Sequence, residues 1–364
     1  MHITLDTKEL QSKLELVGRV STKHVTLPVL QCVLISVQKG VVTLKATNLE
    51  VGIEASLPAK VEEEGVIAVP ASVLIQTINY NTNREVTLQT EDTTLVVEGG
   101  GSRTQIKSIP HDEFPTILRL DGSGQSVQRE LFSLGVKSAV FAASLSSIKP
   151  ELGSVYIFQK KEHSLTFVAT DSFRLMEKTV PQKNITLDSS LLIPAKNATE
   201  ITRILDLMND DPLMRFTENQ CSFEFSDGLY VTTRLTTGSF PDYAQIIPKE
   251  YVTHSTVLRS DLMQILKKTN IFLNKFSQVS LHVTDRSITI SANNGELGTT
   301  TESLAAETDG DDLTLSFNQR YVSEVLGHLV DDSIVLHFAG IGRPMVIEGV
   351  NDKSVRYLVM PMNK

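Results

Sequence analysis

Short alternations of apolar and polar residues dominate the chain, and one of them returns three times. An apolar residue, Thr, a second apolar residue, any residue and Ala follow one another in segments 42–47, 165–170 and 288–293. The starts of these segments are 123 residues apart in both steps. Alternation with a period of two is typical of a half-buried strand. The pattern therefore predicts one folding unit that the chain contains three times.

A second set of equivalent positions supports the same repeat. Val69-Pro70-Ala71, Ile193-Pro194-Ala195 and Phe317-Asn318-Gln319 stand 124 residues apart, each directly before a segment with helical periodicity. Solenoid repeats run to about 20–50 residues and cannot fold alone, whereas a unit of about 120 residues can bury its own core. We therefore predict three domains, at residues 1–124, 125–250 and 251–364.

Each predicted domain contains two helical patterns. In the first helix, Leu10, Leu14, Val17 and Val20 lie on one face, which is the stripe of an amphipathic helix. The first helices are predicted at 8–20, 127–142 and 260–273, and the second helices at 72–84, 195–206 and 319–331. Ser260 or Asp261 is the predicted N-cap of the third domain's first helix, because short polar side chains accept hydrogen bonds from free helical N–H groups.

The remaining apolar segments predict an antiparallel sheet. Short alternating runs such as 86–88, 94–97, 223–225 and 334–336 are separated by Gly, Asp and Asn, and their connections are too short for parallel crossovers. The predicted fold class is α+β: three tandem repeats, each with two helices on one face of antiparallel sheets. The links near 121–124 and 249–251 are short. If the domains join with a constant rotation, the six helices line the inner face of an arc.

The composition indicates the class of protein and its expected location in the cell. Hydrophobic residues make up 41% of the 364 and charged residues 21%, which describes an ordinary globular protein. No apolar run approaches the roughly 18 residues that span a bilayer, and the N-terminus has no signal-peptide pattern, so we expect a cytoplasmic protein without a membrane partner. The only two cysteines, Cys32 and Cys221, lie in apolar alternating stretches and are expected to be buried and unpaired.

Charge is unevenly distributed along the sequence. The formal net charge is −9, yet segments 8–24, 72–84, 128–149, 195–206, 259–275 and 319–331 together carry +7, which leaves −16 for the remainder. One interpretation is that a basic helical face meets the phosphates of a nucleic acid without reading its sequence. The alternative is that helix surfaces commonly carry lysine. The sequence contains no helix-turn-helix or zinc-finger pattern that would read bases.

The usual catalytic signatures are absent. Gly99-Gly100-Gly101-Ser102 lacks the Lys of a phosphate loop and precedes a strand pattern, so a hairpin turn is the better interpretation. The eight histidines have no metal-ligand spacing. Asp171 near Arg174 suggests an acid with a guanidinium partner, but Asn48 and Asn294 occupy the equivalent places, which favours a turn-forming residue. We predict no catalysis, no metal and no cofactor.

Three segments carry a resemblance to a known family: 169–175, 238–243 and 357–362, with further matches at 26–30 and 46–50. Over its whole length the sequence resembles the bacterial DNA polymerase III beta subunit family, the sliding clamps. The resemblance implies the DNA clamp fold, with three similar domains in each chain, and two chains that close head to tail into a ring around duplex DNA. It also implies a processivity factor of DNA replication that acts in the cytoplasm, at the nucleoid.

The resemblance also implies sites. A cleft for short peptides, which tethers the polymerase III catalytic subunit, the clamp loader and other proteins with a clamp-binding motif, would comprise Leu152, Thr170, Ser172, Phe173, Arg174, Leu175, Pro241, Gln245, Ile246, Val359, Met360, Pro361 and Met362. Family members commonly carry Gly-His where Ser172-Phe173 stands and Arg where Gln245 stands. The DNA contacts would be Lys23, His24, Lys149 and Lys196. In the homodimer interface, Thr104 and Ile106 of one chain would face Ile271 and Phe272 of the other.

Two other functions stay open. One is a metal-dependent DNA-processing enzyme that uses Asp171 as a ligand or acid. The other is a scaffold with the same three domains that does not form a ring.

Overall fold

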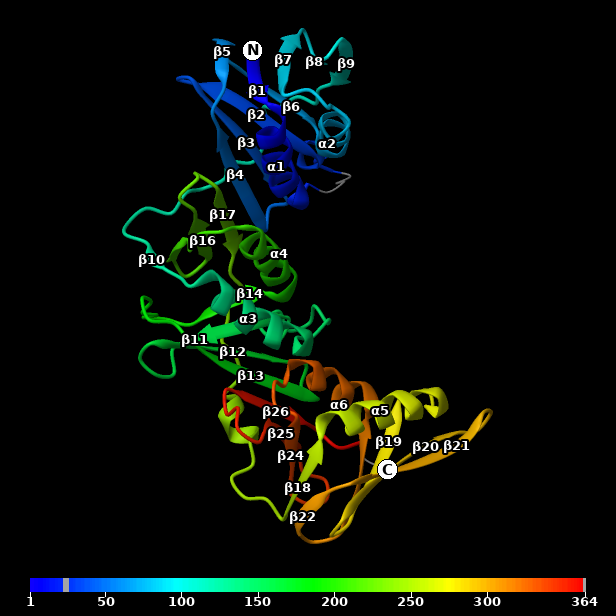
Figure 1. The fold of residues 1–364 in the computed structure, drawn as a ribbon. Coiled ribbons are helices and arrows are strands. Elements are labelled where there is room, and N and C mark those ends of the chain that lie inside the picture. Colours follow the sequence, from blue (N-terminus) through cyan, green and yellow to red (C-terminus); the bar gives the residue numbers. More distant parts are fainter. Residues whose placement is uncertain (22–25, 363–364) are drawn as a thin grey trace. The chain divides into compact units, whose positions relative to one another are not determined.

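The computed structural model describes residues 1–21 and 26–362 and divides into two compact units (Figure 1). The first unit contains Met1–Glu130 and Thr199–Leu235, and the second contains Leu131–Ala198 and Thr236–Lys364. Each unit contains two antiparallel sheets. The predicted α+β class and antiparallel strands are therefore confirmed. No helix in the described part of the chain is long and apolar enough to cross a membrane.

The first unit holds a five-stranded and an eight-stranded sheet. The five-stranded order is β5 (Lys60–Glu63), β1 (His2–Asp6), β7 (Glu85–Glu91), β8 (Thr94–Gly99) and β9 (Ser102–Lys107). The eight-stranded order is β10 (Gln125–Ser126), β15 (Leu213–Phe216), β16 (Gln220–Glu224), β17 (Tyr230–Arg234), β4 (Val51–Leu57), β3 (Val41–Thr47), β2 (Cys32–Gln38) and β6 (Gly65–Pro70). Helix α1 (Thr7–Val17) packs against β3, β4 and α2 (Ala71–Asn79).

The second unit holds a nine-stranded and a four-stranded sheet. The nine-stranded order is β14 (Leu191–Pro194), β11 (Ser154–Phe158), β12 (Ser164–Thr170), β13 (Arg174–Pro181), β26 (Val355–Val359), β25 (Met345–Gly349), β24 (Ser333–Phe338), β18 (Thr253–Leu258) and β22 (Glu307–Gly310). The four-stranded order is β21 (Gly298–Ala305), β20 (Ser287–Asn294), β19 (Gln278–Val283) and β23 (Leu313–Asn318). Helix α5 (Arg259–Thr269) packs against β18, β20, β21 and α6 (Gln319–Val325).

The repeated segments fold alike. The three alternating segments form β3, β12 and β20, and the three second anchors mark the passage from β6 to α2, from β14 to α4 (Ala195–Leu207) and from β23 to α6. Two strand pairs join successive repeats, because β4 pairs with β17 and β13 pairs with β26. The strands of the middle repeat are thus divided between two sheets and two units. The predicted domain boundaries at 124 and 250 stay a prediction.

The first helix of each repeat ends in a tighter 3₁₀ turn. The pairs are α1 with η1 (Gly18–Val20), α3 (Arg129–Ala139) with η3 (Val140–Ala142), and α5 with η5 (Asn270–Phe272). α3 begins two residues later than predicted. α6 continues as η6 (Leu326–His328), and two further 3₁₀ turns are η2 (Pro28–Gln31) and η4 (Tyr243–Ile246). The predicted N-cap of α5 is wrong: the cap is Leu258, and the Arg259 N–H donates instead to the Asp332 carbonyl at 2.8 Å.

Two local predictions are confirmed. Gly100 and Gly101 have φ of 59° and 83° and lie in the turn between β8 and β9, where Gly99 pairs with Ser102. A two-residue hairpin with two positive φ angles favours glycine at both places. Cys32 and Cys221 are free and buried, and burial raises the pKa of the Cys32 thiol to about 11.

Two histidines face each other on the nine-stranded sheet. His254 of β18 pairs with His337 of β24, and their Nδ1 atoms are 2.7 Å apart. One imidazole must donate and the other accept, so both rings cannot be protonated while this bond persists. The ring of Tyr251 covers the pair, with centroids 5.6 and 5.0 Å away.

The surroundings disfavour a charged His337. Burial lowers its pKa, and His254, Lys353 and Arg356 lower it further, while Glu348, at 4.0 Å from Nε2, acts in the opposite direction. Asp309 lies opposite His254 on β22. Because the pKa of His337 is lower in the folded state than in the unfolded state, its contribution to stability is present above the ordinary histidine pKa of about 6.5 and is lost as pH falls through the folded value.

We therefore expect the free energy of unfolding of the second unit to fall between pH 7.5 and 5.5, and to fall less in His337→Gln, which cannot take up the proton. Urea denaturation at the two pH values measures this difference. His282→Gln, on the exposed face of β19, serves as the control. An equal loss in the native protein and in His337→Gln would contradict the assignment.

Candidate functional site

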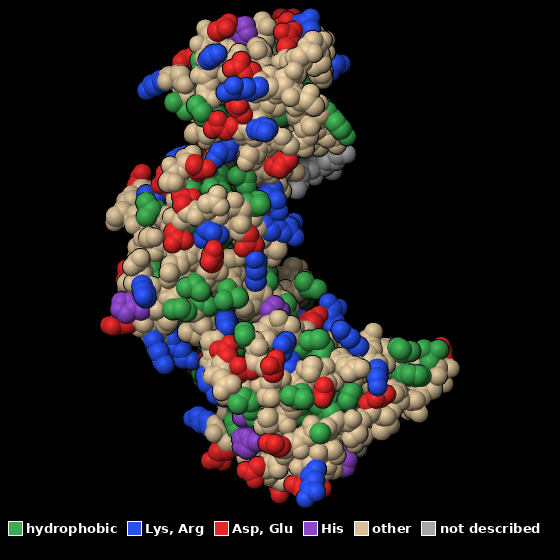
Figure 2. All heavy atoms as spheres, in the orientation of Figure 1, with side chains coloured by type: hydrophobic (Ala, Val, Ile, Leu, Met, Phe, Trp, Pro, Cys, Tyr) green, Lys and Arg blue, Asp and Glu red, His purple; other side chains and the backbone are tan. Residues whose placement is uncertain are grey.

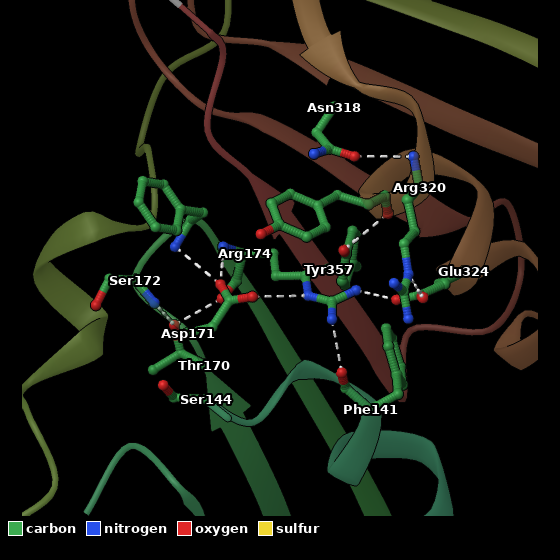
Figure 3. Close-up of polar contacts among 12 residues, drawn as sticks. Phe141, Ser144, Thr170, Asp171, Ser172, Arg174, Asn318, Arg320, Glu324 and Tyr357 are labelled. Atoms are coloured by element: carbon green, nitrogen blue, oxygen red, sulfur yellow. Dashed lines mark hydrogen bonds and ion pairs between the residues drawn. The ribbon is translucent and has the colours of Figure 1, made fainter. Parts of the chain in front are cut away.

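The loop between β12 and β13 is folded by its own side chains (Figure 3). Asp171 Oδ1 accepts hydrogen bonds from the N–H groups of Phe173 and Arg174, at 2.9 and 3.0 Å. The Thr170 hydroxyl donates to the Arg174 carbonyl at 2.6 Å and accepts from the Ser172 N–H at 3.1 Å. Ser172 adopts a φ of 77°. The sequence Thr-Asp thus encodes a tight turn, because both side chains bond to the backbone ahead of them.

The other two repeats use the same turn chemistry. Asn48 Oδ1 accepts from the N–H groups of Glu50 and Val51, and Asn294 Oδ1 accepts from Glu296 and Leu297. The prediction that this position carries a turn-forming residue is confirmed. Asp171 is therefore employed as a structural acceptor, as its amide counterparts are.

Arg174 turns its side chain into the protein. Its side chain is 8% exposed, its Nε donates to Asp171 Oδ2 at 3.1 Å, its Nη2 donates to the Phe141 carbonyl at 2.8 Å, and its Nη1 bonds to Glu324 of α6. The guanidinium also lies over the ring of Tyr321, 4.5 Å from its centroid. Arg174 thereby connects strand β13, η3 and helix α6 (Figure 3).

The ion pairs outweigh the cost of burial for both partners. Burial lowers the pKa of Arg174, but the hydrogen bond and charge of Glu324 raise it, and the balance lies above the ordinary value. Burial raises the pKa of Glu324, but hydrogen bonds from Arg320 and Arg174 bring it below the ordinary value. Both groups are therefore charged at neutral pH. The resemblance implies that Arg174 belongs to the peptide cleft; in the structure its guanidinium bonds to Asp171, Phe141 and Glu324.

Next to this loop, the structure brings several of the predicted cleft residues together. The Met360 N–H donates to the Phe173 carbonyl at 2.8 Å, and the Met362 N–H donates to the Ser316 carbonyl at 2.7 Å. The segment after β26 is thus held by backbone hydrogen bonds on two sides. Leu175 belongs to an apolar cluster that includes Met360.

The predicted cleft residues differ in exposure. Leu152, Thr170, Leu175 and Val359 are buried and can act only as a floor. Phe173 is 61% and Ile246 47% exposed. Apart from the buried Arg174, the remaining members are exposed or half-buried: Ser172, Pro241, Gln245, Met360, Pro361 and Met362. Gln245 Nε2 donates to Asp242 at 2.8 Å.

A neighbouring groove was not predicted. It has a volume of about 550 Å³ and shares Pro241 with the predicted cleft. Its wall includes Tyr156, Phe158, Glu177, Phe240, Tyr243 and Arg356. The alternation of Tyr156 and Phe158 on β11 was the available signal, since it places two aromatic rings on one face of a strand. Both rings lie against the apolar cluster around Leu175.

The predicted DNA contacts are only partly described. Lys23 and His24 lie outside the described residues, whereas Lys149 and Lys196 are exposed. Part of the helical charge is neutralised within the protein: Lys13 of α1 is buried and pairs with Asp227. Figure 2 shows basic and acidic side chains exposed over the same parts of the visible face.

The predicted interface residues lie on an edge strand, β9, and on the 3₁₀ turn η5. Thr104 is exposed on β9, the last strand of the five-stranded sheet, while Ile106 on the same strand is only 4% exposed because its side chain packs in its own unit. Of these two, Thr104 is therefore the one whose side chain is open to a partner. Ile271 on η5 is 66% exposed and Phe272 is half-buried.

Among the described residues, no group of three or more His, Cys, Asp or Glu side chains is placed to hold a metal ion.

The chain is similar to a known protein family over nearly its whole length. Three family models match it: the N-terminal domain of the DNA polymerase III beta subunit at residues 1–118, its central domain at 126–242 and its C-terminal domain at 244–363. The beta sliding clamp of Synechococcus elongatus is 28% identical over 374 residues and covers 100% of this chain and 99% of that protein. The Escherichia coli K12 beta sliding clamp is 28% identical, with 100% of both covered.

The chain is also similar to solved structures. The DNA polymerase III subunit beta of Pseudomonas aeruginosa superposes with a TM-score of 0.94 at 25% identity and full coverage of both chains. A sliding clamp from the same organism, bound to griselimycin, has a TM-score of 0.92 at 25% identity, again with 100% of both chains covered.

Removing the Arg174 side chain leaves Asp171 and Glu324 without their buried partner. We expect Arg174→Ala to reduce the free energy of unfolding of the second unit by about 3–5 kcal/mol, the usual cost of breaking a buried ion pair from one side. Urea denaturation measures the loss.

Lys268→Ala is the matched control, because Lys268 also lies in the second unit, pairs with Glu302 and is 52% exposed. Its loss should stay within about 1 kcal/mol. Similar small losses in both variants would show that Arg174 does not hold the second unit together.

Proposed function

The chain belongs to the DNA polymerase III beta subunit family, and from that premise we propose that two copies close head to tail into a ring around duplex DNA. As a sliding clamp it is a processivity factor of DNA replication and not an enzyme. Its proposed partners are duplex DNA of any sequence, the polymerase III catalytic subunit, the clamp loader and other proteins with a clamp-binding motif. We place it in the cytoplasm, at the nucleoid.

The observation that carries the dimer is the strand pairing between successive repeats. In the first repeat β4, which follows β3, pairs with β17, the last strand of the second repeat. In the second repeat β13, which follows β12, pairs with β26, the last strand of the third. Within the described residues, two corresponding strands lack such a partner: β21, which follows β20, and β9, the last strand of the first repeat.

Both of these strands are at the edge of a sheet, where unpaired backbone groups invite another strand. One chain has a single β9 and a single β21, so pairing the β21 of one copy with the β9 of another joins unlike surfaces, as a head-to-tail contact requires. The side chains support this pairing: Lys107 is exposed on β9, while Glu296 is exposed at the start of the β21 hairpin. The exposed Ile271 adds an apolar contact.

The DNA contact we propose is weak and electrostatic. Lys149 and Lys196 would meet phosphates, and their long, mobile side chains suit contacts that are made and broken as the ring moves. Because the proposed ring encloses the DNA, it does not need to bind DNA tightly. The binding cleft would use the exposed Phe173 and Ile246 and the half-buried Met360 as adaptable apolar contacts for a short peptide.

The enzyme alternative finds little support at Asp171. Both carboxylate oxygens are engaged, Oδ1 by two backbone N–H groups and Oδ2 by Arg174. A DNA-cleaving activity with magnesium that Asp171→Ala abolishes would restore it.

Retention on DNA tests the ring. Protein loaded onto nicked circular DNA should stay bound through gel filtration and should be released within minutes after a restriction enzyme linearises the circle. Equal retention on circular and linear DNA would contradict enclosure.

The proposed interface has its own test. Ile271→Asp places a charge in the contact, and we expect the dissociation constant of the dimer to rise at least tenfold, since burying an unpaired charge is costly. Sedimentation equilibrium should then report the 40.1 kDa of one chain at concentrations where the native protein is dimeric. Ile341→Asp, at a position that is 85% exposed elsewhere in the second unit, should leave the dimer unchanged. A native protein that is monomeric at all concentrations would favour the scaffold without a ring.

A further inference from the structure

One wall of the proposed cleft is a segment outside the sheets. Residues 237–251 connect β17 to β18, contain only the short η4 turn, and supply Pro241, Gln245 and Ile246 to the cleft. Backbone hydrogen bonds tie the flanks of this connector, from the Thr236 N–H to Leu192 at 2.8 Å and from the Val252 N–H to Phe338 at 2.8 Å. The position of the wall between these flanks then depends on side chains that reach back to the sheet.

The polar anchor is Tyr243. Its hydroxyl donates to Glu177 Oε2 of β13 at 2.5 Å, and Glu177 Oε1 also accepts from Lys160 Nζ at 3.2 Å. Glu177 is only 6% exposed. Burial first, and then the hydrogen bond to Glu177, raise the pKa of Tyr243 above its ordinary value, so the phenol stays protonated and continues to donate. A buried carboxylate with two donors is a strong point of attachment.

An aromatic contact adds to this anchor. The ring of Phe240 stacks on Tyr156 of β11, with centroids 4.7 Å apart and planes within 2°. Phe240, Tyr243 and Ile247 all pack against the apolar cluster that contains Leu175. These three inward side chains alternate with the cleft residues of the same connector.

The first repeat has an equivalent anchor. Glu54 of β4 stands 123 residues before Glu177 and is 4% exposed. It pairs with Lys45 at 3.1 Å and with Arg119 at 3.1 Å, and Arg119 stands 124 residues before Tyr243 in the preceding connector. The two anchors differ in chemistry, guanidinium in one and phenol in the other, but each attaches the connector to a buried glutamate on the strand that joins two repeats.

We infer that Tyr243 and Glu177 are positioning residues of the peptide cleft, which hold the connector so that Pro241, Gln245 and Ile246 face an incoming peptide. The inference rests on the proposed function. In this role neither residue needs to touch the peptide. Their contribution to affinity comes from fixing the wall before binding, which lowers the cost of ordering it on binding.

The experiment compares Tyr243→Phe, Glu177→Gln and the double variant. The probe is a fluorescein-labelled peptide, chosen as the tightest binder in an array that tiles the polymerase III catalytic subunit of the same organism. Fluorescence anisotropy gives its dissociation constant. Hydrogen exchange of amides 240–247 reports on the connector, and thermal unfolding reports on the fold.

Tyr243→Phe removes one oxygen and keeps the ring. We expect the dissociation constant to rise about threefold to tenfold, the range of one hydrogen bond to a charged group that is partly expressed in binding. Exchange at 240–247 should accelerate by a similar factor. The double variant should bind no more than about twofold weaker than the weaker single variant, because both changes break the same contact.

Arg119→Gln is the matched control, because it disturbs the equivalent anchor in the first unit. It should accelerate exchange at 117–122 and leave peptide affinity within twofold. Two results would overturn the positioning role. One is a Tyr243→Phe variant that binds the peptide as tightly as the native protein. The other is a double variant whose loss of affinity equals the sum of the two single losses.

A second comparison separates this inference from the proposed function. A variant that lacks residues 360–364 should lose peptide affinity at least tenfold. If it does and Tyr243→Phe does not, the cleft stands and the positioning role fails. If the native protein binds no peptide of the array, the proposed cleft itself is wrong.

Discussion

Strand pairing between neighbouring repeats is the interaction on which the rest of the structure depends. Backbone groups on β4 and β13 must be paired if they are to be buried, and the last strand of the next repeat supplies the partners. Two repeats thereby share one continuous sheet at each joint. A side chain on the joining strand can then be surrounded by both repeats, which explains why buried charged groups such as Glu54, Glu177 and Arg174 lie there.

These charged groups fix the positions of loops and helices, which the strand pairing alone does not determine. A strand pair sets register and direction, but loops and helices beside it can still settle in several ways. Arg174 attaches η3 and α6 to β13, and Glu177 attaches the connector through Tyr243. Because a buried charge without its partner is costly, each attachment is favoured over arrangements that lack it. The proposed cleft therefore has three sides: the Asp171 turn, the Met360 segment, which is hydrogen-bonded to that turn, and the connector, which has its own attachment.

Much of the fold could be predicted from sequence because its signals are local. Alternation located β3, β12 and β20, and helical periodicity located the starts of α4 and α6. The turn role of Asp171 could be predicted because three copies of one position could be compared. The N-cap of α5 could not, since the acceptor for the Arg259 N–H is a carbonyl more than seventy residues away. The direction of the Arg174 side chain also depends on distant partners, Phe141 and Glu324. The groove beside Tyr243 was only partly predictable: alternation places Tyr156 and Phe158 on one face of β11, but Phe240 and Tyr243, which complete its wall, come from a distant connector.

The two joints within the chain differ from the proposed joint between chains in how they are secured, and this difference bears on the proposed ring. The two joints within the chain combine a strand pair with a buried carboxylate that anchors a covalent connector. A joint between β21 of one chain and β9 of another would have the strand pair, the exposed Ile271 and charges near the surface, such as Lys107 and Glu296, whose pairs are screened by salt and contribute little each. At the position 123 residues after Glu177 stands Thr300, which brings no charge into the contact. Of the joints in such a ring, the ones between chains are therefore the least strongly held, and a ring that must pass DNA through its wall would open there while the joints within each chain stay closed.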